Sequence, residues 1–545
     1  MKEIDSATFA GMVRQGAAVL GREKSNVNDL NVFPVPDGDT GDNMYMTIKT
    51  GCTALDGSTA TLSETASAVS SKMLLGARGN SGVILSRMFA GLAKGFTNLE
   101  TASVEDFTMA MKKAVEEAYS SVSNPVEGTI LTVLREGVEN ADSGSGLDVY
   151  FDTLLEAMRE SLEHTPEKLD VLREAGVVDS GGAGLVCIVE GMRDMLEGKR
   201  FAEPEAPQAD VPNATLDLSA FGEDSVMEFG YCTEFLLRLT RNKVDPDAFD
   251  ERELFSWLEA NGESVVAFRE GTIIKAHIHT FTPGEILNHV QRYGEFLTIK
   301  IENMALQHHQ TVEDKAPEPE FRLPRKKYAI VTVASGEGLA GSLREIGADV
   351  VIPGGQTMNP STQDFLDAFD KVDAGTILVF PNNSNVIMAA EQAASMYAKA
   401  EVKVLHSKDF GQGYYGIASV DSSCGDSAQV VSDVAQAMEN LVTGEVSRAV
   451  RDALSGNVRV HADEYVGYSG KEILCCSPSR EEAAVRLCEK LGADRRDVML
   501  LFRGCDVPEE EAAALVGKLS ASYRNLEIIT NDGGQPVYDY ICVLC

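Results

Sequence analysis

The sequence predicts a multidomain chain with an all-α domain first, an α+β domain in the middle and an α/β domain last. At 545 residues the chain exceeds what one hydrophobic core usually supports, and about three domains are expected. Apolar residues recur at helical spacing up to about residue 200, whereas strand-like runs alternate with helical patterns beyond that point. Proline-bearing segments at 201–215 and 311–327 are predicted to be linkers.

Each domain is justified by its own pattern. In the domain at 1–200, apolar residues at helical spacing are Phe9, Met12, Val13, Val19 and Leu20. In the domain at 216–310, the expected strands are 232–239, 264–270 and 272–279, with helices at 249–260 and 283–293. In the domain at 328–545, apolar strand candidates at 328–333, 376–380 and 401–405 alternate with helices, as in a parallel sheet, and a strand-helix-strand set from about Glu472 suggests a subdomain.

Charge, hydropathy and cysteine content argue against several classes of function. The chain has 48 basic and 84 acidic residues, a formal charge of −36, which opposes nucleic-acid binding and binding to anionic membranes. No run of 18 apolar residues predicts a transmembrane helix, and the N-terminus reads as an amphipathic helix instead of a signal peptide. Ten cysteines are then expected to be reduced thiols in the cytoplasm.

The segment Asn31–Met44, NVFPVPDGDTGDNM, carries the strongest signal. Asp37 and Asp39 flank Gly38, so a turn can direct both carboxylates at one point, and such oxygen ligands suit Mg²⁺ bound together with phosphates. Amides at the start of the following helix would favour an anion. The alternative is an ordinary Asp/Gly turn with solvated carboxylates.

Two further glycine clusters precede helical patterns. Gly76–Gly82 reads GARGNSG, and Asp179–Gly184 reads DSGGAG. Either one alone could be only a helix cap, but three candidate anion-binding helix starts in one domain favour a nucleotide site.

These motifs, together with EGTILTV at 127–133 and EAGVVDSGGAG at 174–184, resemble the nucleotide-binding L domain (DAK2 domain) of dihydroxyacetone kinases. The whole chain more closely resembles the ATP-binding kinase component of bacterial fatty acid kinases, through the later motifs GYCTEF, KAHIHT, TIKIENM and GGQTMNPST. The resemblance implies an N-terminal helical barrel that binds ATP through two Mg²⁺ ions. It also implies a C-terminal α/β domain related in fold to the fatty-acid-binding DegV proteins.

Site residues follow from the same resemblance. Asp37 and Asp39 would ligate Mg²⁺, with Asn31 as a third candidate, while Asp42 departs from the family pattern and either adds a ligand or faces solvent. Arg78 and Arg173 are candidates for stabilising transition-state charge. The expected nucleotide-binding residues are Thr40, Gly41, Asn43, Met44, Gly79, Asn80, Ser81, Gly82, Thr129, Asp179, Gly181 and Gly182.

A zinc site is the second candidate. His277 and His279 are two positions apart on a predicted strand, so their side chains share one face, and Cys232 lies on an earlier strand. Three suitable ligands are visible where structural zinc usually takes four, so ordinary strand histidines are the alternative. The family resemblance favours Zn²⁺.

Other motifs in the last domain are less specific. GEGLAG at 336–341 follows a strand but lacks the acidic residue that a dinucleotide site requires, so a strand-to-helix turn is expected. The polar loops Gly354–Ser361 and Asn382–Asn385 could face a ligand or a partner protein. No Walker A motif is present, and Cys542 and Cys545 are interpreted as structural.

The expected function is transfer of phosphate from ATP to the carboxylate of a fatty acid, presented by a separate DegV-family carrier protein. An ionised carboxylate needs no general base, which fits the absence of any histidine before His164. The alternatives are phosphorylation of a small hydroxyl substrate and a zinc-containing scaffold without turnover. A homodimer is a further expectation.

Overall fold

The computed structural model describes residues 3–31, 38–55, 61–122, 124–144, 146–199, 231–241, 243–245, 249, 251–270, 272–303, 325–355, 359–424, 426–455 and 458–545. The chain forms two compact units. Unit 1 contains Met1–Glu205 together with Pro324–Cys545, and unit 2 contains Ala206–Leu323. Both ends of the chain therefore fold into one unit, and the division into three domains stays a prediction.

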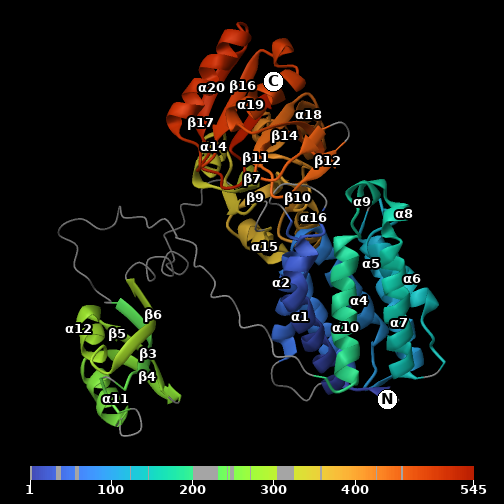
Figure 1. Ribbon diagram of the computed structural model, residues 1–545, viewed down its shortest axis with the longest axis vertical. Coiled ribbons are helices and arrows are strands. Elements are labelled where there is room, and N and C mark those ends of the chain that lie inside the picture. The colour runs from blue at the N-terminus through green and yellow to red at the C-terminus, as the bar shows by residue number, and fades with distance from the viewer. Residues whose placement is uncertain are drawn as a thin grey trace. The chain divides into compact units, whose positions relative to one another are not determined.

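The first part of unit 1 is helical, as predicted (Figure 1). Its helices are α1 (Ser6–Asn28), α2 (Thr40–Cys52), α3 (Leu62–Gly76), α4 (Gly79–Gly95), α5 (Val104–Ser120), α6 (Ile130–Asn140), α7 (Leu147–Glu163), α8 (Thr165–Lys168), α9 (Asp170–Ala175) and α10 (Ser180–Leu196). A short 3₁₀ turn, η1 (Thr53–Leu55), follows α2. Two short strands that the sequence did not predict, β1 (Glu3–Ile4) and β2 (Ala102–Ser103), pair antiparallel and join the chain start to the beginning of α5.

Capping and aromatic packing fix these helices. Thr61 and Ser103 each accept a hydrogen bond from the third backbone N–H of the helix that follows, and the acidic side chain at that position accepts one from the N–H of the capping residue, which satisfies backbone groups that a helix end leaves open. The core of this helical part includes a chain of contacting aromatic rings: Phe9, Phe96, Phe107, Tyr150 and Phe151. All five are buried.

The last part of unit 1 opens with a parallel sheet, which confirms the predicted α/β alternation. The sheet has the order β10-β9-β7-β8. Its strands are β7 (Lys326–Ala334), β8 (Val350–Pro353), β9 (Ala374–Phe380) and β10 (Glu401–Val404). The accompanying helices are α14 (Glu337–Glu345), α15 (Thr362–Asp370), α16 (Ile387–Met396), α17 (Phe410–Ala418) and α18 (Ser427–Glu439).

A second sheet completes unit 1, in the order β15-β14-β11-β18-β16-β17. Its strands are β11 (Val442–Arg448), β14 (Tyr465–Ser469), β15 (Glu472–Ser477), β16 (Val498–Arg503), β17 (Glu527–Asp532) and β18 (Tyr540–Leu544). The associated elements are β12 (Ala453–Ser455), β13 (Val458–Val460), α19 (Arg480–Lys490), η2 (Ala493–Arg495) and α20 (Glu509–Ser522). The sheet begins earlier than the set predicted from Glu472, because β11 pairs directly with the last strand, β18.

The helical and α/β parts of unit 1 share a hydrophobic cluster. Ala77 and Val83, at the start of α4, are 0% and 3% exposed and belong to one cluster with Phe365 and Val386 of the α/β part. Hydrogen bonds reinforce this contact: Gln392 Nε2 donates to the Leu74 carbonyl at 2.6 Å. Burial of apolar surface on both sides holds the two parts together.

Unit 2 is an antiparallel four-stranded sheet of order β4-β5-β3-β6. Its strands are β3 (Tyr231–Leu239), β4 (Glu263–Glu270), β5 (Ile273–Thr280) and β6 (Gly294–Asn303), and its helices are α11 (Glu251–Ala260) and α12 (Pro283–Val290). The helices pack against the sheet (Figure 1). Trp257 of α11 stacks on His289 of α12, with 3.5 Å between ring centroids.

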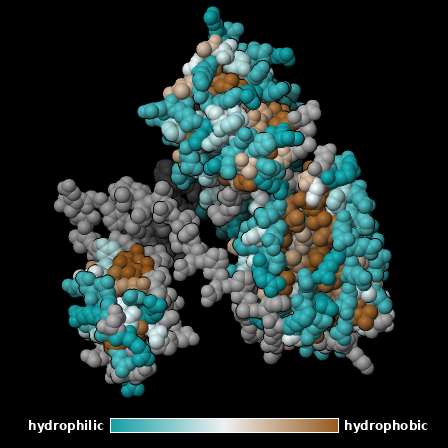
Figure 2. Space-filling model, in the orientation of Figure 1, coloured by the Kyte–Doolittle hydropathy of each residue, from teal (hydrophilic) through white to brown (hydrophobic). Residues whose placement is uncertain are grey.

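The surface is mostly hydrophilic, in keeping with the high net charge. Figure 2 shows hydrophilic side chains over most of the coloured surface, with a hydrophobic strip on the visible face of the helical part. In the part of the chain that the structure describes, no helix combines the length and hydropathy needed to cross a membrane.

Candidate functional site

The N-termini of three helices open onto one cavity of about 1080 Å³ in unit 1. From the helical part, the cavity is lined by Asn31, Asp39, Thr40, Asn43, Asn80, Ser81, Ile84, Ile130, Val171, Asp179, Ser180 and Gly181. These residues include the first turns of α2, α4 and α10, and helix starts favour an anion. Some of the N–H groups are already bonded: those of Gly41 and Asp42 donate to Asn28 Oδ1, and that of Gly182 donates to Asp179 Oδ2. The structure thus brings together the three glycine-bearing motifs that the sequence singled out.

Asn31 connects two of the helix starts. Its Oδ1 accepts hydrogen bonds from Thr40 Oγ1 at 3.1 Å and from Ser180 Oγ at 3.0 Å. The first turns of α2 and α10 are held side by side by one amide oxygen. Asn31 therefore has a positioning role that the sequence prediction, which named it as a metal ligand, did not include.

Asp39 lies at the border with the α/β part. It is 9% exposed, lines the cavity and stands directly before α2. Its Oδ2 accepts a hydrogen bond from Nδ2 of Asn359, which lies in the polar loop before α15. The second predicted ligand, Asp37, lies outside the described residues.

Close packing sets the position of the α4 start. Gly79 has φ of +58°, and a Cβ there would lie 2.5 Å from Asn43 Nδ2. Only glycine combines this left-handed backbone with so near a neighbour. The side-chain oxygens of Asn80 and Asn359 are buried and have no hydrogen-bond partner among the described residues. A ligand N–H or a cation would give such buried amide oxygens the partner that they lack.

Asp179 caps α10 and faces the cavity. Its Oδ2 accepts a hydrogen bond from the Gly182 N–H at 2.7 Å, and its own N–H donates to Thr165 Oγ1. Burial raises the pKa of the Asp179 carboxyl to about 6, and the N–H bonds only partly oppose that effect. This carboxylate is thus costly to keep charged at neutral pH.

The α/β part supplies the opposite wall. It combines the polar loop 382–385 with Lys408, Asp409 and Lys471. Burial raises the pKa of Asp409, although hydrogen bonds from Thr443 Oγ1 at 2.7 Å and from the Gln412 N–H lower it. Other residues of this wall include Leu339, Gly354, Gly355, Phe410, Leu441, Val442, Thr443, Gln535, Val537 and Ile541.

The sequence left the roles of this wall open. The sequence does not decide whether the loops 354–361 and 382–385 face a ligand or a partner. The structure places Gly354, Gly355 and all four residues of 382–385 on the cavity. Lys408, Asp409 and Lys471 were not recognised as site residues. Nothing in their local sequence distinguishes them, because it is the pairing of distant strands and helices that brings them to the cavity.

Some predicted nucleotide-binding residues do not line the cavity. Met44 is fully buried in the helical core. Gly82 instead allows close packing, since a Cβ there would lie 2.4 Å from Thr47 Oγ1. Gly41 likewise packs against α1, where a Cβ would lie 2.2 Å from the Lys24 carbonyl oxygen. Gly79, Gly182 and Thr129 flank lining residues without lining the cavity themselves.

The side chain of Asp42 is bound by residues of α1. It forms an ion pair with Lys24 at 2.5 Å and accepts a hydrogen bond from Asn28 Nδ2 at 2.7 Å. The departure from the family pattern thus fastens α2 to α1.

The two predicted arginines are held by other groups. Arg78 Nη1 donates to the Asn359 carbonyl at 2.7 Å and lies 3.6 Å from Asp364, so it bridges to the α/β part. Arg173 is exposed on α9 and pairs with Asp170 at 2.6 Å. Neither lines the cavity.

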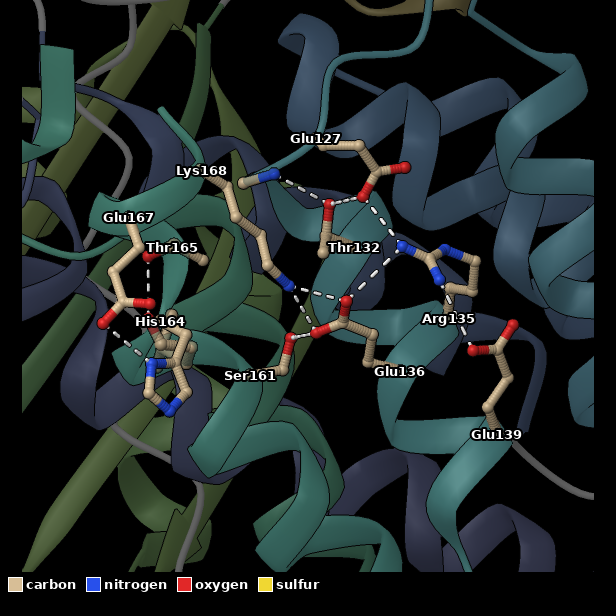
Figure 3. Close-up of polar contacts among 12 residues, drawn as sticks. Glu127, Thr132, Arg135, Glu136, Glu139, Ser161, His164, Thr165, Glu167 and Lys168 are labelled. Carbon is tan, nitrogen blue, oxygen red and sulfur yellow. Dashed lines mark hydrogen bonds and ion pairs between the residues drawn. The ribbon is translucent and has the colours of Figure 1, made fainter. Parts of the chain in front are cut away.

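The EGTILTV motif forms a structural network beside the cavity (Figure 3). Glu127 accepts hydrogen bonds from Thr132 at 2.7 Å and from Arg135 at 2.8 Å, and Glu136 pairs with Lys168 at 2.6 Å. Burial raises the pKa of Glu127, but the bonds from Thr132 and Arg135 outweigh it and lower the pKa overall. This network fixes the start of α6, where Ile130 lines the cavity.

For the candidate zinc ligands, the structure describes only the pairing of their backbone positions in neighbouring strands. Cys232 of β3 lies directly opposite His279 of β5, and Glu234 opposite His277. Their side chains lie outside the described part of the chain. Among described side chains, no group of three or more His, Cys, Asp or Glu residues is arranged to hold a metal ion.

The GEGLAG motif is a packing feature. A Cβ on Gly338 would lie 1.9 Å from the Asp532 carbonyl oxygen, and the Leu339 N–H donates to the Gly533 carbonyl at 2.9 Å. The glycines thus let α14 approach the loop after β17. Cys542 is fully buried in β18 and, like Cys545, is a free thiol, in agreement with a structural interpretation.

Three helix starts that meet on one cavity, in a chain without a Walker A motif, fit the class of kinases that lack a P-loop. Three family profiles match the chain: the DAK2 domain at residues 34–194, the middle domain of FakA-like fatty acid kinases at 228–311, and the C-terminal domain of FakA-like fatty acid kinases at 329–544. Protein YloV of Bacillus subtilis is 38% identical over 99% of both chains, and an uncharacterized protein of Staphylococcus aureus is 33% identical over 99% of both. The chain belongs to the FakA-like family of fatty acid kinases.

Solved structures match single parts of the chain. A fatty acid binding protein DegV from Bacillus subtilis aligns with 40% of this chain and 99% of its own, at 12% identity and a TM-score of 0.30. The dihydroxyacetone kinase of C. freundii in complex with AMP-PNP and Mg²⁺ aligns with 34% of this chain and 33% of its own, at 18% identity and a TM-score of 0.28.

Proposed function

We propose that the chain transfers the γ-phosphate of ATP to the carboxylate of a fatty acid that a separate carrier protein presents, giving an acyl phosphate. The observation that carries this proposal is the single cavity, which has three helix N-termini and Asp39 on one side and a polar, lysine-bearing wall on the other. Membership of the family supplies the acceptor, and the cavity supplies the means of holding the donor.

The donor side fits a nucleotide bound with Mg²⁺. Asp39, Asp179, Asp409 and Glu445 line the cavity, so a polyphosphate would meet strong repulsion without a cation. Asp37 and Asp39, with Asn31 as a third candidate, would hold Mg²⁺, two ions being the prediction. When bound, Mg²⁺ neutralises phosphate charge during transfer.

The remaining donor contacts come from backbone and small polar groups. Thr40, Asn43, Asn80 and Ser81 line the cavity at the starts of α2 and α4, where the helix dipole favours an anion. The unpartnered Asn80 oxygen is a buried acceptor for a ligand N–H or a cation. These groups position the phosphates and require no proton transfer.

The phosphate transfer requires no general base. A carboxylate oxygen forms a bond to the γ-phosphorus while the bond from that phosphorus to the bridging oxygen breaks, and ADP leaves. A fatty acid is already ionised at neutral pH, so no proton has to be removed. No histidine is among the described residues that line the cavity.

The acceptor side is proposed to lie along the α/β wall. Lys408 and Lys471 are exposed on the cavity, and neither forms a salt bridge with another described residue. Ammonium groups here would attract an anionic carboxylate and shield it from the phosphates. The proposed partner is a fatty-acid-binding carrier of the DegV family. The fatty acid kinase B3 protein of Streptococcus pneumoniae has been solved loaded with linoleic acid.

Other elements of the proposal remain predictions. We place the reaction in the cytoplasm and keep the helical barrel and the homodimer as expectations. Arg173 could reach the phosphates only if α9 moves, since its guanidinium is exposed and paired with Asp170.

The middle unit is proposed to bind Zn²⁺ through Cys232, His277 and His279. The antiparallel register supports this, because directly opposed residues of neighbouring strands bring their Cβ atoms within about 5.5 Å. Metal analysis of the purified protein should find one zinc per chain, and replacing His277 and His279 by Ala should remove it. Full zinc content in that variant would refute these ligands.

The test of function measures ATP consumption by the full chain with a fatty-acid-loaded carrier. Asp37→Ala and Asp39→Ala should each abolish Mg²⁺-dependent turnover. Asp42→Asn is the matched control, since it lies in the same segment but pairs with Lys24. Turnover with dihydroxyacetone and no carrier would instead support a small hydroxyl substrate, and unchanged turnover in the Asp variants would support a scaffold.

A further inference from the structure

The nucleotide site of the helical part has a direct contact from the α/β part, through Asn359. Nδ2 of Asn359 donates a hydrogen bond to Oδ2 of Asp39, across 320 positions in sequence. We propose that Asn359 is a positioning residue for the metal-binding carboxylate of Asp39. This inference rests on the proposed Mg²⁺-nucleotide site.

The contact is buried on both sides. Asn359 is 1% exposed and Asp39 is 9% exposed, so water competes little for the hydrogen bond. A hydrogen bond to one oxygen restricts the orientation of a carboxylate, which is how a neighbouring donor prepares such a group to bind a cation. Because the donor is a neutral amide, it orients the carboxylate without neutralising the charge that holds the cation.

Asn359 is itself fixed in place. Arg78 Nη1 donates to its backbone carbonyl at 2.7 Å, and the backbone of Arg78 pairs with Ser361 in an isolated antiparallel bridge. The Thr362 N–H donates to the Ala77 carbonyl at 3.2 Å. The chain just before α4 and the loop before α15 are thus bonded to each other at and just beyond Asn359. This arrangement gives Arg78 a function in the site without any contact with phosphate.

The amide also lies beside the start of α4. A Cβ on Gly79 would lie 3.4 Å from Asn359 Nδ2 and 2.5 Å from Asn43 Nδ2. Two amides, one from each part of unit 1, therefore flank the same glycine. The orientation of Asp39 and the position of the α4 start depend on one small contact region, so the α/β part helps to form the donor site.

Another buried contact provides a matched control. Gln392 is 3% exposed and also crosses between the two parts, donating to the Leu74 carbonyl at 2.6 Å and to Thr362 Oγ1 at 3.2 Å. It does not contact Asp39. Loss of Gln392 loosens the same interface, whereas loss of Asn359 also removes a hydrogen bond to the Asp39 carboxylate.

The experiment measures binding of a non-hydrolysable ATP analogue to the full chain by calorimetry, over a series of Mg²⁺ concentrations. Asn359→Leu, which is similar in size but cannot donate, should weaken the apparent affinity for Mg²⁺ about 10- to 100-fold. Gln392→Leu should change it less than about threefold. Asn359→Ala, which adds no apolar bulk, covers the case in which the leucine variant does not fold, and thermal unfolding checks each protein.

The outcomes separate this inference from the proposed function. Mg²⁺-dependent binding that is lost in Asp39→Ala but unchanged in Asn359→Ala would overturn the positioning role alone. An equal loss in Gln392→Leu and Asn359→Leu would show that the interface, and not the carboxylate, is responsible, and would also overturn it. A parent protein without Mg²⁺-dependent binding would overturn both proposals.

Discussion

Replacing Asp179 by Asn should stabilise the protein at neutral pH. The carboxylate of Asp179 caps α10, and Asn is an equally good N-cap, so the hydrogen bond to the Gly182 N–H is kept. What changes is the charge, which burial makes unfavourable. The pKa of this carboxyl is raised to about 6 in the folded protein, against about 3.9 in an unfolded chain.

The magnitude follows from proton linkage. Because the folded state binds the proton more tightly, stability is greatest below the unfolded pKa and falls as pH rises through the folded pKa. For pKa values of 3.9 and 6, the cost of the charged carboxyl is about 2 kcal/mol at pH 5.5 and about 3 kcal/mol at pH 8. Asp179→Asn should regain these amounts, with the larger gain at the higher pH.

The assay is chemical denaturation, with unfolding monitored by the circular dichroism signal of the helices. Tryptophan fluorescence would not serve, since the single tryptophan is Trp257 in unit 2. Hydrogen exchange of the α10 amides gives a second, local measurement. The reasoning is refuted if Asp179→Asn is less stable than the parent at pH 8, or if the two proteins differ equally at both pH values.

Three further predictions concern the cavity. Gly79→Ala should destabilise unit 1 by roughly 2 kcal/mol and weaken nucleotide binding, as measured by thermal unfolding and calorimetry, because alanine is strained at φ of +58° and would crowd Asn43. Lys408→Ala should lower kcat/KM for a loaded carrier about tenfold in steady-state kinetics, while nucleotide affinity stays within about threefold. An unchanged kcat/KM would exclude Lys408 from the acceptor side. Asp42→Asn should leave the Mg²⁺ concentration required for turnover unchanged. It should cost less than about 1 kcal/mol of stability, since the ion pair between Asp42 and Lys24 is partly exposed. A higher Mg²⁺ requirement would show that Asp42 is a metal ligand.

Local patterns predicted the elements of the fold well. The apolar run at 328–333 is β7 (Lys326–Ala334), and the run at 376–380 is the end of β9 (Ala374–Phe380). Helix starts were less accurate, since α10 begins at Ser180 and not after the glycines at 181–184. The cap from Asp179 to the Gly182 N–H stabilises a first turn that glycine propensity alone would disfavour.

The donor half of the site was also accessible from sequence, because each helix start has its own glycine motif. The opposite wall was not. Lys408 and Lys471 reach the cavity only because β10 and β14 end near it, and strand pairing over such separations leaves no local signal. The contact between Asn359 and Asp39 is an extreme case, since neither residue identifies the other.

The arrangement of the chain explains why the donor site depends on residues so far apart. Residues 206–323 form their own unit between two segments that fold together. The entropic cost of closing a flexible connection grows only with the logarithm of its length. A long insertion in the sequence is therefore tolerated if the two segments on either side of it bind each other strongly enough. That interface includes Ala77 and Val83, which immediately flank the first turn of α4. The same apolar contacts that hold the two segments together therefore also fix a helix start of the proposed nucleotide site.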